Sequence, residues 1–160
     1  MIDNALNYRL MHPTDVQDVS ELVSHVFDEL LASEYPPEGI QEFHRYIQPT
    51  ALLARSQANH FTFVSVAHDC IVGMIEVRDY NYISLLFVAQ QYHGQGIART
   101  LWHKALQVCQ RNEPGLSQVS VNASAYAVPF YEKIGFYPVG DKQVKNGISF
   151  IPMLLKVSKS

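Results

Sequence analysis

The segment that most constrains the fold runs from Ile83 to Trp102. An apolar strand leads into a polar loop with glycines at positions 94 and 96, and the loop opens directly into an amphipathic helix. A helix N-terminus carries unpaired N–H groups and roughly half a positive charge, so it binds phosphate without basic side chains. Glycine lets the backbone there adopt positive φ and approach a ligand closely. We therefore interpret this segment as a pyrophosphate-binding unit.

Length and composition indicate an ordinary globular protein. The 160 residues suffice for a single domain, expected over residues 1–160, that buries a core without disulfides or metal. The formal net charge of −3 and the lack of a basic cluster argue against a nucleic-acid or anionic-membrane partner. Cys70 and Cys109 lie among apolar residues and belong to no disulfide or metal-binding motif. We therefore expect reduced thiols and not a disulfide. No signal peptide or apolar run of about 18 residues is present, so we expect a cytoplasmic location.

Hydrophobic periodicity predicts alternating helices and strands. Steps of three and four residues predict a first helix after a short strand, and Thr14 and Gln17 have the spacing of a capping box before it. The expected strands are 7–11, 61–67, 71–78, 82–88, 117–122, 136–139 and 148–157. The expected helices are 16–31, 37–47, 96–111 and 125–134, with residues 50–58 ambiguous and 140–147 a polar hairpin loop.

The connections between these elements determine the expected sheet. Short turns make the three strands 61–67, 71–78 and 82–88 antiparallel, whereas a helical crossover places strand 117–122 parallel to 82–88. The resulting α/β fold is a mixed, mostly antiparallel sheet of six or seven strands with helices on both faces.

The glycine loop by itself is weak evidence for any one ligand. Gly94-Gln95-Gly96 is only a GxG, which often just makes a turn. The dinucleotide fingerprint fails because Arg99 occupies the third glycine position, and the Walker pattern fails because no Gly-Lys-Ser/Thr follows. A nucleotide-binding protein of another class therefore stays an alternative.

A second segment narrows the interpretation. It comprises Val119–Ser124 and then Tyr126–Phe136, which contains FYEKIGF. The two segments, at this separation and in this element order, resemble the GNAT superfamily of acetyl-CoA-dependent N-acetyltransferases. The loop motif Gln/Arg-x-x-Gly-x-Gly/Ala fits in two registers, residues 91–96 and residues 93–98 with His93 first, and we prefer the second. The resemblance covers residues 61–157 well.

The resemblance implies a coenzyme A site at known places in the fold. The strand before the loop would splay from its parallel neighbour, and the pantetheine arm would pair with the backbone of Leu86, Phe87 and Val88 as an added strand. The pyrophosphate would sit at the start of the helix, and Asn122 and Ser124 would contact pantetheine or substrate unless they merely cap the strand end. The loop residues in this expected site are His93, Gly94, Gln95, Gly96, Ile97, Ala98 and Arg99.

Tyr131 is the residue that we expect to take part in the chemistry, because the resemblance places it beside the coenzyme sulfur. Amine attack on a thioester releases a thiolate, and a phenol with a pKa of about 10 can protonate a thiolate whose thiol has a pKa of about 8.5. The alternative is a tyrosine that only packs on the cofactor.

The attacking amine must lose a proton, and Glu76 is the candidate general base. Glu76 could act directly or through water, and a surface salt bridge is its alternative role. Tyr80 and Tyr82 are further candidates for a water chain.

The sequence thus predicts an N-acetyltransferase that moves an acetyl group directly from acetyl-CoA to a primary amine. The alternative is an acyl-CoA-binding module without turnover. No HxxxH or HExxH pair indicates a metal site. The partner would be a small-molecule or peptide amine, which the sequence does not identify, and a homodimer is possible. Glu29, Glu34 and Glu38 could favour a cationic amine.

Overall fold

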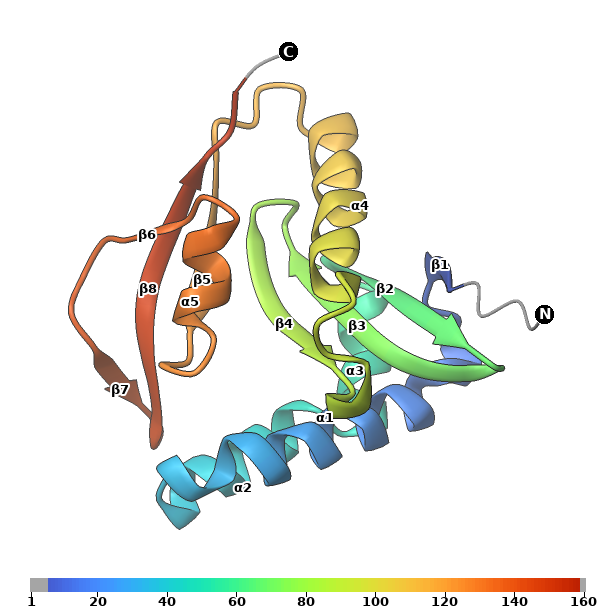
Figure 1. Ribbon diagram of the computed structural model, residues 1–160, viewed down its shortest axis with the longest axis vertical. Coiled ribbons are helices and arrows are strands. Elements are labelled where there is room, and N and C mark those ends of the chain that lie inside the picture. The colour runs from blue at the N-terminus through green and yellow to red at the C-terminus, as the bar shows by residue number, and fades with distance from the viewer. Residues whose placement is uncertain (1–5, 159–160) are drawn as a thin grey trace.

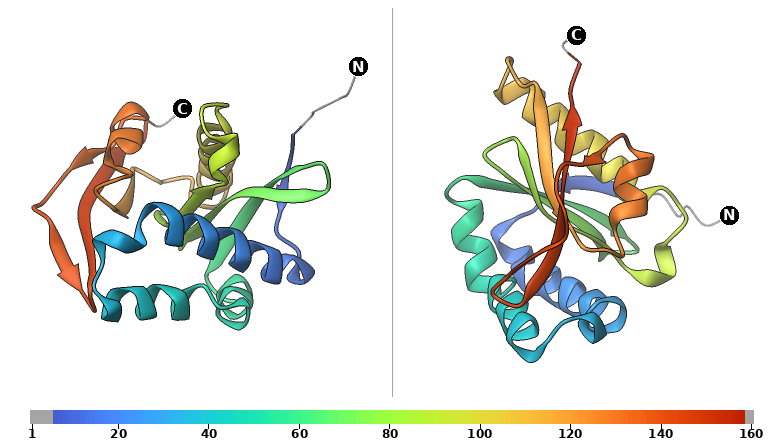
Figure 2. Two further views of the ribbon diagram at one scale, coloured as in Figure 1. Left: turned by 60° about the horizontal axis from the view of Figure 1, so that its bottom comes forward. Right: turned by 90° about the vertical axis from the view of Figure 1, so that its left-hand side faces the viewer.

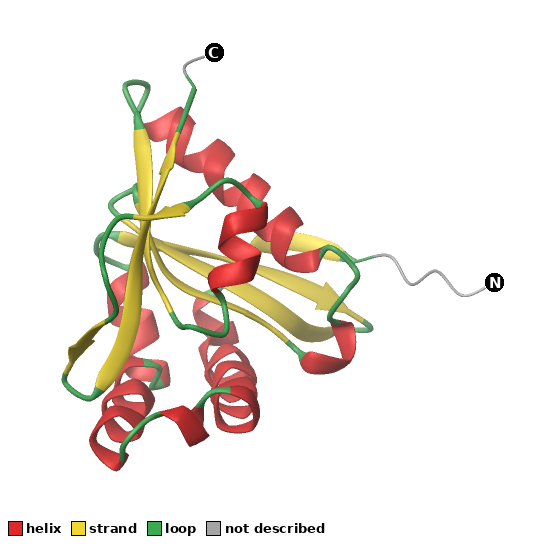
Figure 3. Cartoon of the chain, turned by 60° about the vertical axis from the view of Figure 1, so that its left-hand side comes forward, coloured by secondary structure: helices red, strands yellow, loops and turns green. Residues whose placement is uncertain are grey.

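The structure, a computed structural model, describes residues 6–158 and contains one twisted sheet with helices on both faces (Figures 1 and 3). The strands lie in the order β1-β2-β3-β4-β5-β8-β6, with β7 paired to β8. Every pairing is antiparallel except that of β4 with β5. The predicted α/β class and mixed sheet are therefore confirmed, with eight strands in place of six or seven.

The elements follow the predicted order closely. The strands are β1 (Asn7–Leu10), β2 (His60–Ala67), β3 (Cys70–Arg78), β4 (Tyr82–Val88), β5 (Gln118–Ala123), β6 (Tyr137–Pro138), β7 (Gln143–Lys145) and β8 (Ile148–Lys156). The helices are α1 (Val16–Leu30), α2 (Pro37–Tyr46), α3 (Pro49–Ser56), α4 (Ile97–Asn112) and α5 (Val128–Lys133), with short 3₁₀ turns at Pro13–Asp15, Ala32–Glu34 and Gln90–Tyr92. No helix in this described part is long and apolar enough to cross a membrane.

Two local predictions need correction. The start of α1 is organised by Asp15, whose carboxylate accepts hydrogen bonds from the backbone N–H of His12 and from Arg9, both at 2.7 Å. Thr14 and Gln17 do not form a capping box there, and Gln17 instead donates to Glu21. The polar segment 140–147 is also more regular than expected, since it contains β7.

Two clusters of buried apolar residues hold the layers together. On one face α1 and α3 pack on the sheet through Val19, Val23 and Leu52. On the other face α4 packs through Leu101, Trp102 and Ala105, and Tyr131 of α5 belongs to the same cluster. Figure 2 shows α1, α2 and α3 together on one side and α4 and α5 on the other.

A bulge in β4 changes which side chains face each layer. Glu76 pairs with Leu85 and Val77 pairs with Ile83, so Ser84 is an extra residue in β4. As a result Ile83 packs in the α4 cluster, although Leu85, two residues later, packs in the α1 cluster. The bulge lies where β4 begins to leave its parallel neighbour.

The parallel pair β4–β5 opens after a very short contact. Its register contains only the pairs Tyr82–Ser120 and Ile83–Val121, although β4 continues to Val88 and β5 to Ala123. The remaining residues of the two strands form the walls of an opening in the middle of the sheet. This geometry is the splayed arrangement that the family resemblance implied.

Candidate active site

A first cleft, of about 490 Å³, lies between the end of β4, the start of α4 and the helix α5. We call it the cofactor cleft. It is lined by most of the residues predicted to bind the cofactor, namely Leu86, Phe87, Val88, His93, Gly94, Gly96, Ile97, Ala98, Arg99 and Ser124. The structure therefore brings these ten predicted residues to one cleft. Gln95 is not among the residues that line it, and Asn122 lines the neighbouring cleft.

The backbone of β4 offers hydrogen-bonding groups to this cleft. The N–H of Ala89 donates to Val72 of β3 at 2.8 Å, and hydrogen-bonding directions alternate along an antiparallel strand. Leu86 and Val88 therefore direct their backbone groups away from β3, toward the opening. His93 confirms this direction, because its Nε2 donates to the carbonyl oxygen of Val88 at 2.8 Å. Leu86 is thus the residue whose N–H and C=O both point into the opening.

The start of α4 has the conformation that glycine was predicted to supply. Gly94 and Gly96 have φ angles of 82° and 79°, and Gly96 is the residue just before the helix. A Cβ at either position would meet nothing within 4 Å, so the backbone conformation and not the available space requires glycine there. The first turn of α4, whose N–H groups have no partner within the helix, lines the cofactor cleft with Ile97, Ala98 and Arg99.

A second cleft, of about 500 Å³, lies on the α1–α2 side of the opening. We call it the acceptor cleft. The helices α1 and α2 and the segment between them line it with aromatic residues, namely Phe27, Tyr35, Phe43 and Tyr46. The opposite wall comes from the β7–β8 hairpin, and Arg78, Tyr82 and Asn122 line it from the sheet. None of Glu29, Glu34 and Glu38, which the sequence suggested for a cationic amine, is among its lining residues.

The hairpin and α2 meet at the rim of the acceptor cleft. Gly39 of α2 faces Gly147 of the hairpin so closely that a Cβ on Gly39 would lie 2.1 Å from the carbonyl oxygen of Gly147. The hydroxyl of Tyr35 donates to the carbonyl of Ser149 at 3.4 Å beside this contact. Figures 1 and 2 both show the tip of the hairpin against α2.

Tyr131 lies where the two clefts meet, since it lines both. The start of α5 places it there. The Ser124 hydroxyl accepts a hydrogen bond from the N–H of Ala127 at 3.2 Å, and Pro129 falls in the first helical turn, where proline is tolerated. The Tyr131 side chain is only 4% exposed. Burial, and next the proximity of Tyr82, raise the pKa of Tyr131, so its phenol stays protonated at neutral pH.

Comparison with known proteins agrees with this geometry. A family model described as the acetyltransferase (GNAT) domain matches residues 31–157. The chain belongs to the GNAT acetyltransferase family. The family and the enzyme class predicted from the sequence are thereby confirmed.

Individual relatives of this GNAT protein are distant in sequence. The uncharacterized N-acetyltransferase YafP of Escherichia coli (strain K12) is 28% identical over 144 residues, which cover 89% of this chain and 88% of YafP. The crystal structure of PaiA N-acetyltransferase from Thermoplasma acidophilum in complex with coenzyme A superposes with a TM-score of 0.80 at 19% identity, over 96% and 99% of the two chains. A GCN5-related N-acetyltransferase from Rhodopseudomonas palustris gives a TM-score of 0.80 at 20% identity, over 98% and 99%. These likenesses establish the GNAT fold.

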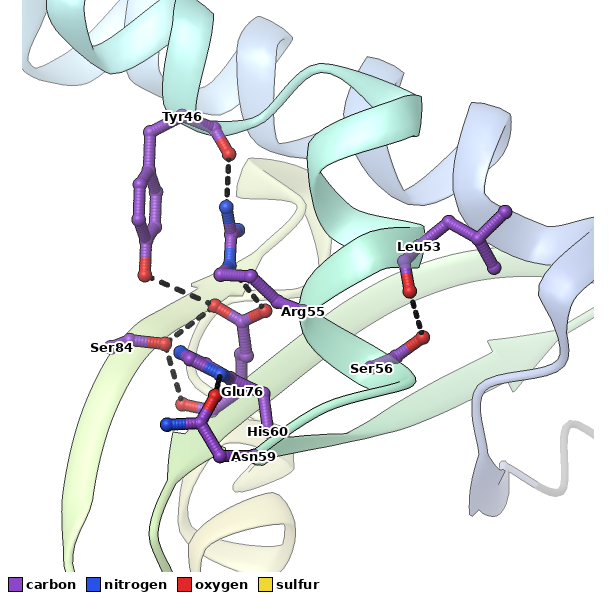
Figure 4. A network of polar contacts seen from close by, with 8 residues as sticks. All are labelled: Tyr46, Leu53, Arg55, Ser56, Asn59, His60, Glu76 and Ser84. Atoms are coloured by element: carbon purple, nitrogen blue, oxygen red, sulfur yellow. Dashed lines mark hydrogen bonds and ion pairs between the residues drawn. The ribbon is translucent and has the colours of Figure 1, made fainter.

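Glu76 of this GNAT protein lies behind the acceptor cleft, in a buried polar network (Figure 4). Its side chain is completely buried, and its carboxylate accepts hydrogen bonds from Arg55 Nε at 3.0 Å and from the Ser84 hydroxyl at 2.5 Å. The Tyr46 hydroxyl lies 3.5 Å from the same carboxylate. Tyr46 and Ser84 line the acceptor cleft, whereas Glu76 is not among the lining residues of either cleft. The alternative role expected from the sequence, a salt bridge at the surface, is wrong because the ion pair that Glu76 forms is buried.

Arg55 completes this network from α3. Its Nη1 donates to the carbonyl oxygen of Tyr46 at 2.7 Å, and its guanidinium lies 3.6 Å from the centre of the Tyr46 ring. Burial, and next the charge of Glu76, raise the pKa of Tyr46. Removing a proton from an amine onto Glu76 would leave the Arg55 cation buried without its counter-ion, which is costly. The role of Glu76 as general base therefore stays a prediction, and the geometry favours a role in positioning Tyr46 and Ser84.

Sequence reasoning missed most residues of the acceptor cleft. Tyr46, Arg78 and the hairpin residue Ser149 come from elements that are remote in sequence, and only the folded sheet brings them together. In the cofactor cleft it missed Tyr92, Tyr126 and Phe130. Tyr126 is 51% exposed, and only the fold brings it to the same cleft as Gly94 and Gly96, so no sequence signal identifies it.

Proposed function

We propose that this protein transfers an acetyl group directly from acetyl-CoA to a primary amine. The observation that carries the proposal is the position of Tyr131, a buried phenol at the junction of the cofactor and acceptor clefts. Two reactants, one in each cleft, would meet beside this side chain. Holding them in that geometry is itself a large part of catalysis.

The cofactor cleft supports the use of acetyl-CoA. The pyrophosphate would accept hydrogen bonds from the first turn of α4 next to Gly96, and the pantetheine arm would pair with the free backbone groups of Leu86. The N–H of Leu86 or Val88 could then polarise the thioester carbonyl. Among residues 6–158 no group of three His, Cys, Asp or Glu side chains is arranged to hold a metal ion.

The proposed reaction is balanced without a covalent enzyme intermediate. The amine nitrogen forms a bond to the acetyl carbon, the carbon–sulfur bond breaks, and the thiolate takes the Tyr131 phenolic proton. The proton that the amine loses goes to solvent through the acceptor cleft, and the polar side chains of Tyr46, Tyr82 and Ser84 line that route. Burial makes the phenolate of Tyr131 unfavourable, so Tyr131 would give up its proton only as it takes another from solvent through the acceptor cleft, and this proton balances the one that the amine loses.

The test is a comparison of Tyr131→Phe with the wild type. Release of free coenzyme A is measured with acetyl-CoA and a panel of amines, and coenzyme A affinity is measured by calorimetry. We expect kcat to fall about 100-fold or more, the usual contribution of a positioned acid, while coenzyme A affinity stays within about 2-fold. Equal turnover by the two proteins would remove Tyr131 from the mechanism. If the wild type binds coenzyme A tightly but acetylates no amine, the protein is an acyl-CoA-binding module.

A further inference from the structure

The charge of the acceptor cleft constrains which amine can bind there. Its charged lining residues are Glu42, Arg78 and Lys145. Glu42 is the single carboxylate, and it already forms an ion pair with Arg45 one turn further along α2. A site for a polyamine or an aminoglycoside needs several carboxylates, because each ammonium must keep a counter-charge when it leaves water. This cleft instead has an excess of positive charge, so it favours an acceptor that carries at least one anionic group.

Arg78 is placed to bind that group. Its guanidinium carbon lies 4.2 Å from the centre of the Tyr82 ring, at the end of β3, and Tyr82 lines the same cleft. This cation–π contact restricts the guanidinium, and the planar fork of a guanidinium can bind a carboxylate through two parallel hydrogen bonds.

The ion pair that Arg78 forms within the protein is weak enough for a ligand anion to bind to its guanidinium. Within residues 6–158 Arg78 forms an ion pair with Asp79, whose Oδ2 lies 3.7 Å from Arg78 Nε, and both side chains are about half exposed. The other oxygen of Asp79 accepts a hydrogen bond from Asn59 at 3.1 Å. A long, solvated contact of this kind contributes little, so a ligand anion could replace or join it without much loss.

The other wall of the cleft fits a flat apolar body. The rings of Phe27 and Phe43 stack with centroids 4.0 Å apart, and the Tyr35 ring stacks on Phe27 at 5.6 Å. The Phe43 ring also contacts Phe87 of β4 at 5.8 Å. These rings are held by one another on the α1–α2 side, facing the cleft. Phe27 is only 2% exposed and supports the other rings, so an aromatic or aliphatic group would bury apolar surface against Tyr35 and Phe43.

We propose that the acceptor is a monoamine that carries an anionic group and an apolar body, with Arg78 binding the anion. An apolar α-amino acid and an ω-amino acid both have this chemistry. The inference rests on the proposed transfer to an amine and adds the acceptor class and a specificity residue. The amine would point toward Tyr131, because Tyr131 lines the same cleft as Arg78 and Tyr82 at its junction with the cofactor cleft.

The experiment compares matched amines that differ only in the carboxylate. The pairs are phenylalanine with phenethylamine and 6-aminohexanoate with pentylamine, and spermidine and kanamycin represent polycations. Coenzyme A release is followed at saturating acetyl-CoA for the wild type, for Arg78→Gln and for Arg111→Gln. Arg111 is exposed at the end of α4 and lines neither cleft, so its variant is the matched control for loss of one positive charge.

We expect the carboxylate-bearing member of at least one pair to have a kcat/KM about 10-fold or more above that of its partner. Arg78→Gln should abolish that preference by raising the KM of the carboxylate-bearing amine, with kcat nearly unchanged. Arg111→Gln should keep it. Which pair responds distinguishes an α-amino acid from an ω-amino acid.

Three outcomes would overturn the inference, and they differ in what they say of the proposed function. A preference for spermidine or kanamycin, or for the amines without a carboxylate, would refute the anionic acceptor but leave the transferase intact. An unchanged preference in Arg78→Gln would remove Arg78 as its cause. If no amine is acetylated, binding of the same pairs to the coenzyme A-loaded protein is measured by calorimetry. If binding then requires the carboxylate and Arg78, the result supports the anion site without the transfer reaction. If none of the amines binds, the result refutes both the anion site and the proposed transfer to an amine.

Discussion

Arg55 and Glu76 form a buried ion pair, with 3.0 Å between Nε and Oε2, directly behind the acceptor cleft. The pair joins α3 to the middle of β3, and it holds two side chains, Tyr46 and Ser84, that do reach the cleft. The charges are therefore part of the support of the site. Whether one of them also takes part in proton transfer can be decided by separating stability from the pH dependence of the rate.

Glu76→Gln should destabilise the protein strongly, because it leaves Arg55 buried without a counter-ion. We expect a loss of about 3–5 kcal/mol in the free energy of unfolding, measured with urea. The double variant Arg55→Met with Glu76→Met should recover most of that loss. Among molecules that remain folded, the pH profile of kcat/KM should keep its acidic limb. Disappearance of that limb would instead identify Glu76 as the general base.

Gly39→Ala should open the rim of the acceptor cleft. The new Cβ would lie 2.1 Å from the carbonyl oxygen of Gly147, so the hairpin must move away from α2. We expect a lower melting temperature and a several-fold higher KM for the amine, with the KM for acetyl-CoA nearly unchanged. Gly115→Ala is the control, because a Cβ at Gly115 meets nothing within 4 Å. Equal effects of the two substitutions would show that the contact does not shape the cleft.

Gly96→Ala should weaken the binding of coenzyme A through its pyrophosphate. Alanine at a φ of 79° costs about 1–2 kcal/mol, and relief of that strain would turn the first N–H groups of α4 away from the ligand. Calorimetry should show coenzyme A affinity reduced about 10-fold, whereas the affinity for pantetheine, which lacks the pyrophosphate, stays the same. A parallel loss for both ligands would place the pyrophosphate elsewhere.

Tyr131 should make the protein sensitive to alkali. Its pKa in the folded state is raised above the value of about 10 expected in the unfolded chain. Both states hold the proton below pH about 10, so the stability contribution is complete there. Above that pH the unfolded chain ionises first, and stability is lost as pH rises toward the folded-state pKa.

The measurement is urea unfolding of the wild type and Tyr131→Phe at pH 8 and at a pH above 10. The variant should lose less stability between the two conditions, because phenylalanine has no proton to release. Tyr126→Phe removes a half-exposed tyrosine and should keep the wild-type difference. Identical slopes for all three proteins would mean that the Tyr131 phenolate is not penalised by burial.

The sequence predicted the fold well where the residues that determine a structure are neighbours in one segment. The apolar strand before Gly94 and Gly96 and the helix after them hold all the information that their geometry needs, and the structure has both glycines at positive φ. By contrast, α5 begins at Val128 and not at residue 125, because the Ser124 hydroxyl first makes a turn with Ala127. Competition between a side chain and the backbone of this kind is hard to weigh from sequence.

The polar loop shows a signal that could have been used. Asn146 and Gly147 have φ angles of 54° and 80°, the conformation that an Asn-Gly hairpin turn requires, and they join β7 to β8. The environment of Glu76, in contrast, has no signal in the sequence. Nothing in the strand itself indicates that Arg55, from a helix 21 positions earlier, would pair with it. The composition of the acceptor cleft is likewise set by packing between distant elements.

The two-residue pairing of β4 with β5 leaves the sheet with a seam through its centre. A pantetheine arm lying in that seam would form backbone-like hydrogen bonds where β4 and β5 have separated. The bound ligand would therefore connect the two parts of the sheet and stabilise the native state. Each tenfold excess of ligand over its Kd adds about 1.4 kcal/mol to the stability of the native state. The free energy of unfolding of this enzyme would then rise with the concentration of coenzyme A, and the rise would be concentrated at the junction of β4 and β5.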